Sequence, residues 1–251
     1  SLTLSSTVSS KTYNGDTSAT VSSYGLSGFV GTETVTASST SAVFNSEDVT
    51  SASTVTISGI SLSDGTNGGV ASNYSVASTE DVSASITAKS LTVTATAQDK
   101  VYGSALSAGT GYTEFTSVGL ANSETIGSVT VAYSDGESAT DNAATYSDAI
   151  SISAGADGTF TASNYSITYE TGTLTVTQAS LTVTATAQDK VYGSALSAGT
   201  GYTEFTSVGL ANSETIGSVT VAYSDGESAT DNAATYSDAI SISAGADGTF
   251  T

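Results

Sequence analysis

Apolar and hydroxylated residues alternate along much of this chain. In LTVTATA, the side chains of Leu91, Val93 and Ala95 fall on one face of an extended strand and the threonines on the other. The same alternation runs through SVTVAYS (128–134), AISIS (149–153), NYSITYE (164–170) and TLTVT (173–177), and more weakly through GYTEFTSV (111–118). A period of two is typical of strands with one buried and one solvated face. The pattern therefore predicts an all-β protein.

Turn-forming pairs separate these runs. They are Asp135-Gly136, Asp157-Gly158 and Thr171-Gly172, and residues of these types favour tight connections. Helical periodicity does not compete, because Gly, Ser or Thr interrupts every window. Six or seven short strands in a unit of about 90 residues are typical of an immunoglobulin-like β-sandwich. The alternative, a continuous β-solenoid, would need a shorter internal period.

The chain repeats itself. Residues 90–161 are identical to residues 180–251, and SLTLSSTVSSKTYNGDTSA from Ser1 aligns with SLTVTATAQDKVYGSA from Ser90. Self-similarity at a fixed period predicts a tandem array. We expect domains at 1–89, 90–179 and 180–251, the last incomplete at its C-terminal end because counterparts of residues 162–177 are missing.

Very short connections join the expected domains. Only Gln178, Ala179 and Ser180 separate TLTVT from the next LTVTATA. Such a joint allows little swing, so the array is expected to form an extended, semi-rigid rod. The unfinished last domain would leave unpaired strand edges. We expect either that the polypeptide continues beyond Thr251, or that strands of a neighbouring molecule complete the sandwich by β-augmentation.

The amino-acid composition then excludes most catalytic and metal-binding chemistry. The chain has 24 acidic residues, four lysines, no arginine and no His, Cys, Met, Trp or Pro, which gives a net charge of −20. Without His and Cys there is no Ser-His-Asp triad, no thiolate nucleophile and no zinc site of the usual kind, so we expect no enzyme. The charge repels nucleic acid and anionic membranes. No stretch is apolar enough for membrane insertion.

Several longer segments resemble known bacterial repeats. The segments KTYNGDTSATV (11–21), DVTSASTVTISGISLS (48–63) and ASNYSV (71–76) resemble the YDG repeat, although Tyr13-Asn14-Gly15 stands where that pattern has Tyr-Asp-Gly. The segments LTVTATAQDKVYGSAL, GLANSETIGSV and SNYSITYETGTLTVT resemble the MBG (mostly bacterial Ig-like) repeat. The resemblance implies large secreted or surface-anchored bacterial proteins, many of them filamentous-haemagglutinin-like adhesins, in which such repeats form the stalk. It implies an extracellular location and no catalytic residues.

Two functions remain open. The first is a structural spacer of a bacterial surface adhesin or extracellular filament, because identical units cannot be specialised for different ligands. Its partners would be neighbouring repeats of the same polypeptide and other copies of the filament. The second is a multivalent module that binds surface glycans or calcium.

Acidic loops are the candidate calcium site. The stretch YSDGESATDNAATYSD and its copy supply Asp135, Glu137, Asp141, Asp148, Asp225, Glu227, Asp231 and Asp238. Carboxylate oxygens on a loop suit calcium, but no D-x-D-x-D-G spacing is present, and a solvated acidic loop is the alternative.

Lysines recur at the equivalent positions Lys11, Lys100 and Lys190, and asparagines at Asn73 and Asn164. A Lys–Asn isopeptide bond is one interpretation. The other is a solvated lysine or surface ion pair in a turn formed by QDKVYG.

Overall fold

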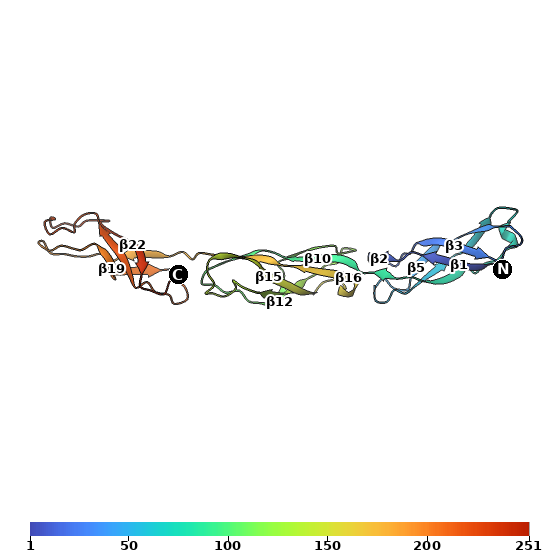
Figure 1. Cartoon of the computed structure of the whole chain (residues 1–251), viewed down its shortest axis with the longest axis horizontal. Helices are drawn as coiled ribbons and strands as arrows, with labels where there is room; N and C mark the ends of the chain where they lie inside the picture. Colours follow the sequence, from blue (N-terminus) through green and yellow to red (C-terminus); the bar gives the residue numbers. More distant parts are fainter. Residues whose placement is uncertain (251) are drawn as a thin grey trace. The chain divides into compact units, whose positions relative to one another are not determined.

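The computed structural model of the chain describes residues 1–250. Strands and loops make up nearly all of the ribbon in Figure 1. Within the described residues the helical segments are two short 3₁₀ turns, η1 (Ala71–Asn73) and η2 (Ala162–Asn164). The prediction of an all-β protein is therefore confirmed. No helix among residues 1–250 is long and apolar enough to span a membrane.

The chain divides into two compact units. Unit 1 contains residues 1–96, 109–132 and 151–171, and unit 2 contains residues 97–108, 133–150 and the chain from 172 onward. The second repeat contributes to both units, because strand β15 (Ala144–Ala156) passes from one into the other.

The first repeat lies wholly in unit 1. Its strands are β1 (Thr3–Val8), β2 (Lys11–Thr12), β3 (Val21–Ser27), β4 (Val35–Ser38), β5 (Ser41–Phe44), β6 (Thr54–Ser58), β7 (Ser61–Asp64), β8 (Thr79–Ser83) and β9 (Ile86–Thr87). β1 pairs with β3, β4 pairs with β7, and β6 lies between β5 and β8, all antiparallel. β2 and β9 pair in parallel. Val55 and Ile57 of β6 are fully buried and lie in the core of this repeat.

Unit 1 also holds half of the second repeat. Here β10 (Lys89–Ala95) lies between the antiparallel β13 (Phe115–Val118) and the parallel β16 (Tyr165–Glu170). β12 (Gly109–Tyr112) pairs antiparallel with β14 (Ser128–Tyr133). Leu91, Val93 and Ala95 are 1%, 0% and 5% exposed, which confirms the alternation predicted for β10.

The stretch GYTEFTSV differs from the prediction of one strand. Its chain leaves β12 after Tyr112 and enters β13 at Phe115, so the two halves belong to different sheets. The weak alternation across Thr113 and Glu114 marks this change of sheet, because a strand that switches partners also switches the face that it buries.

In unit 2, β11 (Gln98–Val101) pairs in parallel with β17 (Gly172–Thr177), and β17 pairs antiparallel with the first part of β15. The expectation of a turn with a solvated lysine at QDKVYG is wrong in this repeat. Lys100 lies in β11, is 6% exposed, and donates from Nζ to the carbonyl of Ser104 at 2.9 Å and to that of Ser138. Backbone carbonyls satisfy this ammonium, which makes its burial tolerable.

Up to residue 250, the third repeat, also in unit 2, has fewer strands than the second. They are β18 (Thr182–Ala185), β19 (Gly199–Tyr202), β20 (Phe205–Val208), β21 (Ser218–Tyr223) and β22 (Ile240–Ala246). β18 pairs with β20, and β21 lies between β19 and β22. Residues 188–191, which repeat the sequence of β11, are not a strand here. The same sequence therefore forms a strand only where β17 is present to pair with it.

Candidate functional site: the joints between repeats

Glu124 accepts two tyrosine hydroxyls at the joint between the first and second repeats, within unit 1. It lies in the loop between β13 and β14, directly after Asn122 and Ser123, whose φ angles are positive at 47° and 58°. Tyr13, which follows β2, donates to Oε1 at 2.5 Å, and Tyr165, which begins β16, donates to Oε2. The tight turn thus holds one carboxylate against tyrosines of both repeats.

The two tyrosine rings also pack on each other. Tyr13 and Tyr165 meet edge to face, with centroids 5.4 Å apart and an interplanar angle of 76°, and they are 4% and 6% exposed. The backbone N–H of Tyr13 donates to the Thr87 carbonyl at 2.9 Å, which ties it to the end of β9. Buried aromatic pairs with satisfied hydroxyls combine apolar contact with fixed orientation. This joint is accordingly a packed interface.

Both joint tyrosines stay protonated at neutral pH. Burial, followed by the hydrogen bond to Glu124, raises the pKa of Tyr165 to about 12. The same causes, in the same order, raise the pKa of Tyr13 well above its usual range. An ionised phenol beside the Glu124 carboxylate would be a partly buried like-charge pair. Each hydroxyl therefore serves as a donor to Glu124.

Asn164 supplies a second polar link across the same joint. It ends η2, is 1% exposed, and donates from Nδ2 to Oδ1 of Asp48 at 2.8 Å. Its own Oδ1 accepts the backbone N–H of Val49 at 2.9 Å. Both ends of this buried amide are therefore paired across the repeat boundary, as a buried polar group requires. Lys11, at the lysine position that recurs in each repeat of this chain, forms an ion pair with Asp16, with Nζ 2.6 Å from Oδ1.

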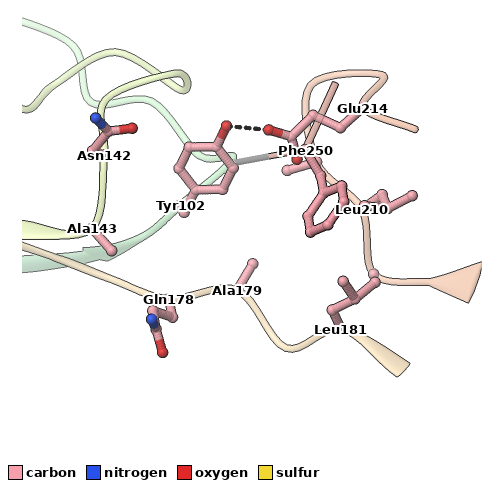
Figure 2. Close-up of a pocket in the computed structure, with 11 residues that line it drawn as sticks. Tyr102, Asn142, Ala143, Gln178, Ala179, Leu181, Leu210, Glu214 and Phe250 are labelled. Atoms are coloured by element: carbon pink, nitrogen blue, oxygen red, sulfur yellow. Dashed lines mark hydrogen bonds between the residues drawn. The ribbon is translucent and has the colours of Figure 1, made fainter. Parts of the chain in front are cut away.

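The tyrosine–glutamate bond recurs at the second joint, within unit 2. Figure 2 shows the Tyr102 ring pointing toward Glu214, and the hydroxyl donates to Oε1 at 2.5 Å. Glu214 repeats Glu124 in the identical segments, and Tyr102 of KVYG aligns with Tyr13 of KTYNG. Asn212 adds a bond from Nδ2 to the Ala139 carbonyl at 2.9 Å.

A glycine follows the joint tyrosine in both repeats because the backbone comes close to the next repeat. Gly15 and Gly103 have φ of +77° and +92°, where a side chain is strained. A Cβ on Gly15 would lie 2.7 Å from Cβ of Asn122, and one on Gly103 would lie 2.6 Å from Cβ of Ala211. The Tyr-Asn-Gly and Tyr-Gly motifs thus provide both the hydroxyl and the close approach.

The second joint contains a cavity of about 670 Å³. Its lining includes Tyr102, Gln178, Leu181, Leu210, Glu214 and Phe250 (Figure 2). At the first joint, Tyr165 fills the corresponding place between Tyr13 and Phe160. Phe250 repeats Phe160, so the cavity lies where a tyrosine equivalent to Tyr165 would pack.

The acidic residues proposed as calcium ligands lie in unit 2, in turns and loops except for Asp148, which lies in β15. Asp135 accepts the N–H of Gly136 at 2.9 Å and Asp141 that of Ser138 at 2.7 Å, and Asp225 and Asp231 repeat these bonds at 2.8 and 2.7 Å. Glu137 and Glu227 are half-buried, and Asp148 and Asp238 are exposed. Among residues 1–250, no group of three or more acidic side chains is placed to hold a metal ion. Calcium binding stays a prediction, while the aspartates have a visible role in shaping turns.

Several tyrosines of the second repeat use their hydroxyls in contacts within the protein. Tyr133 donates to Gln98 at 3.0 Å, Tyr146 donates to the Asn142 carbonyl at 2.9 Å, and Tyr169 accepts the Gly155 N–H at 3.1 Å.

Sequence reasoning missed Glu124 and Glu214 altogether. The available signal was positional, because A-N-S-E and K-x-Y each recur at a fixed phase of the array. Glu124 and Glu214 belong to no catalytic or ligand-binding motif. The sequence therefore gave no reason to pair either glutamate with a tyrosine of the neighbouring repeat.

Strand content and recurring joints define a tandem array of all-β modules held together by side-chain contacts. Residues 1–81 match the YDG domain, and residues 91–175 match the MBG domain of the YGX type. The chain thus contains a YDG domain and an MBG domain, which confirms the resemblance recognised in its sequence. Residues 181–251 repeat residues 91–161 of the matched MBG domain. No curated protein and no solved structure matched the chain.

Proposed function

We propose that this chain is a spacer segment of a secreted or surface-anchored bacterial adhesin or extracellular filament. Its domains are immunoglobulin-like β-sandwiches in tandem, and the array forms an extended rod. Neighbouring repeats are its partners, and it carries out no catalysis. The useful property of such a spacer is its length, which the number of repeats determines.

The recurrence of the joint carries this proposal. The same tyrosine–glutamate bond, at 2.5 Å, closes both joints, although the repeats that donate the tyrosine differ in sequence. A hydrogen bond to a charged group contributes about 1.5–3 kcal/mol, and at the first joint the tyrosine that donates it is buried. A flexible linker needs no such contact, whereas a spacer that transmits length needs one at every boundary.

The backbone connection at the first joint is equally restrictive. β9 ends at Thr87 and β10 begins at Lys89, so only Ala88 lies between a strand of the first repeat and one of the second. Lys89 already pairs with Tyr165 in the register of β10 and β16. Backbone pairing therefore begins at the boundary itself, and little chain remains free to bend.

The first repeat has an acceptor of the same kind. Tyr74 donates to Oε2 of Glu33 at 2.6 Å and accepts the N–H of Val30 at 3.1 Å, and its ring meets Phe29 edge to face at 5.8 Å. Tyr165, Glu124 and Phe160 form the matching set in the second repeat. A YDG and an MBG domain thus share this Glu-Tyr-Phe arrangement, as expected if successive domains of either kind can be joined.

Distance measurements across the first joint test the proposal. Because the chain has no cysteine, spin labels on cysteines introduced at the exposed residues Thr36 and Thr168 report one distance within unit 1. We expect a narrow distribution, similar to that of a control pair at Thr36 and Ser83 inside the first repeat. Combining Tyr13→Phe with Glu124→Gln should broaden the first distribution and leave the control unchanged. A broad distribution in the unsubstituted joint would contradict the spacer function.

A further inference from the structure

We propose that Glu124 makes the first joint sensitive to acid: the joint is closed while this carboxylate is ionised and loosens when it takes up a proton. The inference goes beyond the proposed spacer function and rests on it only in using the same joint. It is carried by the partners of Glu124, which are two phenol hydroxyls that both donate to it.

Glu124 is a double acceptor in a fixed position. Its side chain is half-buried, and each carboxylate oxygen accepts a different phenol, Tyr13 on Oε1 at 2.5 Å and Tyr165 on Oε2. The backbone N–H of Glu124 donates to the Ala121 carbonyl at 2.8 Å, which closes the turn that carries the carboxylate. An ionised carboxylate is an acceptor only, so it suits two donors.

A proton on Glu124 would place a donor where two donors already point. A protonated carboxyl group keeps a good acceptor on its carbonyl oxygen but must direct its O–H toward the other partner. The oxygen of Tyr165 already accepts the N–H of Ala121 at 2.9 Å. One of the two tyrosine bonds is therefore lost or reversed, and the bond that remains is no longer assisted by charge.

The two tyrosines remain donors throughout the acidic range. Burial, followed by the hydrogen bond to Glu124, raises the pKa of Tyr165 to about 12 and that of Tyr13 well above its usual range. The carboxyl group is then the member of this trio that changes its protonation state in acid. Its bonds stabilise the joint at neutral pH, and this contribution is lost as the pH falls and the carboxylate is protonated.

The other ionisable side chains at this joint have partners of their own. Lys11 pairs with Asp16, with Nζ 2.6 Å from Oδ1. Asp48 accepts Nδ2 of Asn164 at 2.8 Å. Because that link has a single donor, the carbonyl oxygen of a protonated Asp48 can still accept it. Acid therefore affects the link through Asp48 less than the one through Glu124.

The general electrostatic effect of acid on this chain has the opposite direction. With 24 acidic residues and four lysines, the net charge is −20 at neutral pH. Protonation of carboxylates lowers this charge and relieves self-repulsion, which favours closer packing of the repeats. Loosening in acid therefore requires a specific carboxylate, and the sign of the change distinguishes the two effects.

Spin-label distances at two pH values test the proposal. Labels on Thr36→Cys and Thr168→Cys, both exposed, should give a narrow distribution at pH 7 that is lost reversibly at about pH 4, where carboxyl groups titrate. A control pair on Thr36→Cys and Ser83→Cys, inside the first repeat, should be the same at both pH values. Glu124→Gln should make the distance across the joint independent of pH. Asp48→Asn should leave the response to acid in place.

The outcomes separate this proposal from the spacer function. A narrow distribution at both pH values would overturn the acid response and leave the spacer function standing, whereas a broad one already at pH 7 would overturn both. Broadening that persists in Glu124→Gln, or that the control pair shares, would also overturn the proposal, because acid would then act elsewhere. Carbon-13 NMR of the Glu124 carboxyl group gives a second readout, and its titration should coincide with the broadening.

Discussion

At the residue scale, one hydroxyl and one carboxylate distinguish a joint from an ordinary loop. Tyr102 and Tyr192 lie in the same sequence, KVYGSAL, yet Tyr102 donates to Glu214 while Tyr192 is 66% exposed. The chain therefore contains its own control for the role of this tyrosine.

Replacing Tyr102 by Phe should destabilise the second joint. The substitution removes the donor to Glu214, and we expect the free energy of unfolding to fall by about 1–2 kcal/mol because the site is only partly buried. Tyr192→Phe should change it by less than about 0.5 kcal/mol. Urea denaturation followed by tyrosine fluorescence measures both. Equal effects of the two substitutions would exclude a role for the hydroxyl in the joint.

The raised tyrosine pKa values predict a loss of stability at alkaline pH. The unfolded chain ionises its phenols near pH 10, whereas the folded pKa of Tyr165 is about 12. The protonated hydroxyl therefore stabilises the fold fully below pH 10, and this contribution is lost as the pH rises toward 12. Denaturation at pH 9 and pH 11.5, with absorbance at 295 nm, checks the trend. The prediction fails if all 13 tyrosines titrate together near pH 10 in the folded protein.

Substitutions at two glycines distinguish the cost of backbone strain from the cost of crowding at the joint. Gly103 and Gly193 both have φ of +92°, but only a Cβ on Gly103 meets another residue, Ala211. Both alanine substitutions incur the same strain of about 1 kcal/mol. We expect Gly103→Ala to cost about 1–3 kcal/mol more, because it also crowds the joint. Thermal unfolding measures the difference, and equal costs would show that the joint does not restrain this turn.

At the element scale, local pattern predicted strands well and their partners poorly. Alternation identified the buried face of β10 because Leu91, Val93 and Ala95 alone determine that face. It could not identify β11, because QDKV is a strand only where β17 lies beside it, and the same letters at 188–191 are not a strand. The contacts at the joints could not be predicted from local pattern either, because Tyr13 and Glu124 lie far apart in the sequence.

Comparing substitutions at Leu91 and Leu181 measures how much β16 stabilises the strand that it pairs with. Leu91→Ala would leave a cavity between β13 and β16 and should cost about 2–5 kcal/mol. Leu181→Ala, at a side chain that is 38% exposed beside the two-stranded β18–β20 pair, should cost about 1 kcal/mol or less. Calorimetric melting of the two variants provides the comparison. Similar losses would mean that β16 does not set the burial of Leu91.

At the scale of the whole molecule, the proposed spacer function requires repeats that lie end to end and do not fold back on one another. Residues 89–101 include β10 and β11, and a fully extended stretch of this length would span about 40 Å at about 3.3 Å per residue. Three such repeats placed end to end would reach about 120 Å, which corresponds to a radius of gyration of about 35 Å for a thin rod. The net charge of −20 adds self-repulsion that salt screens.

Small-angle X-ray scattering at physiological salt tests this central claim most directly. A compact chain of 251 residues has a radius of gyration of about 18 Å. The spacer account predicts a value of about 30 Å or more, with the rod-like decay of an elongated particle, and no change when the salt is raised to about 0.5 M. A radius of gyration near 18 Å, or one that falls markedly as salt screens the charge, would contradict a rod held by its joints.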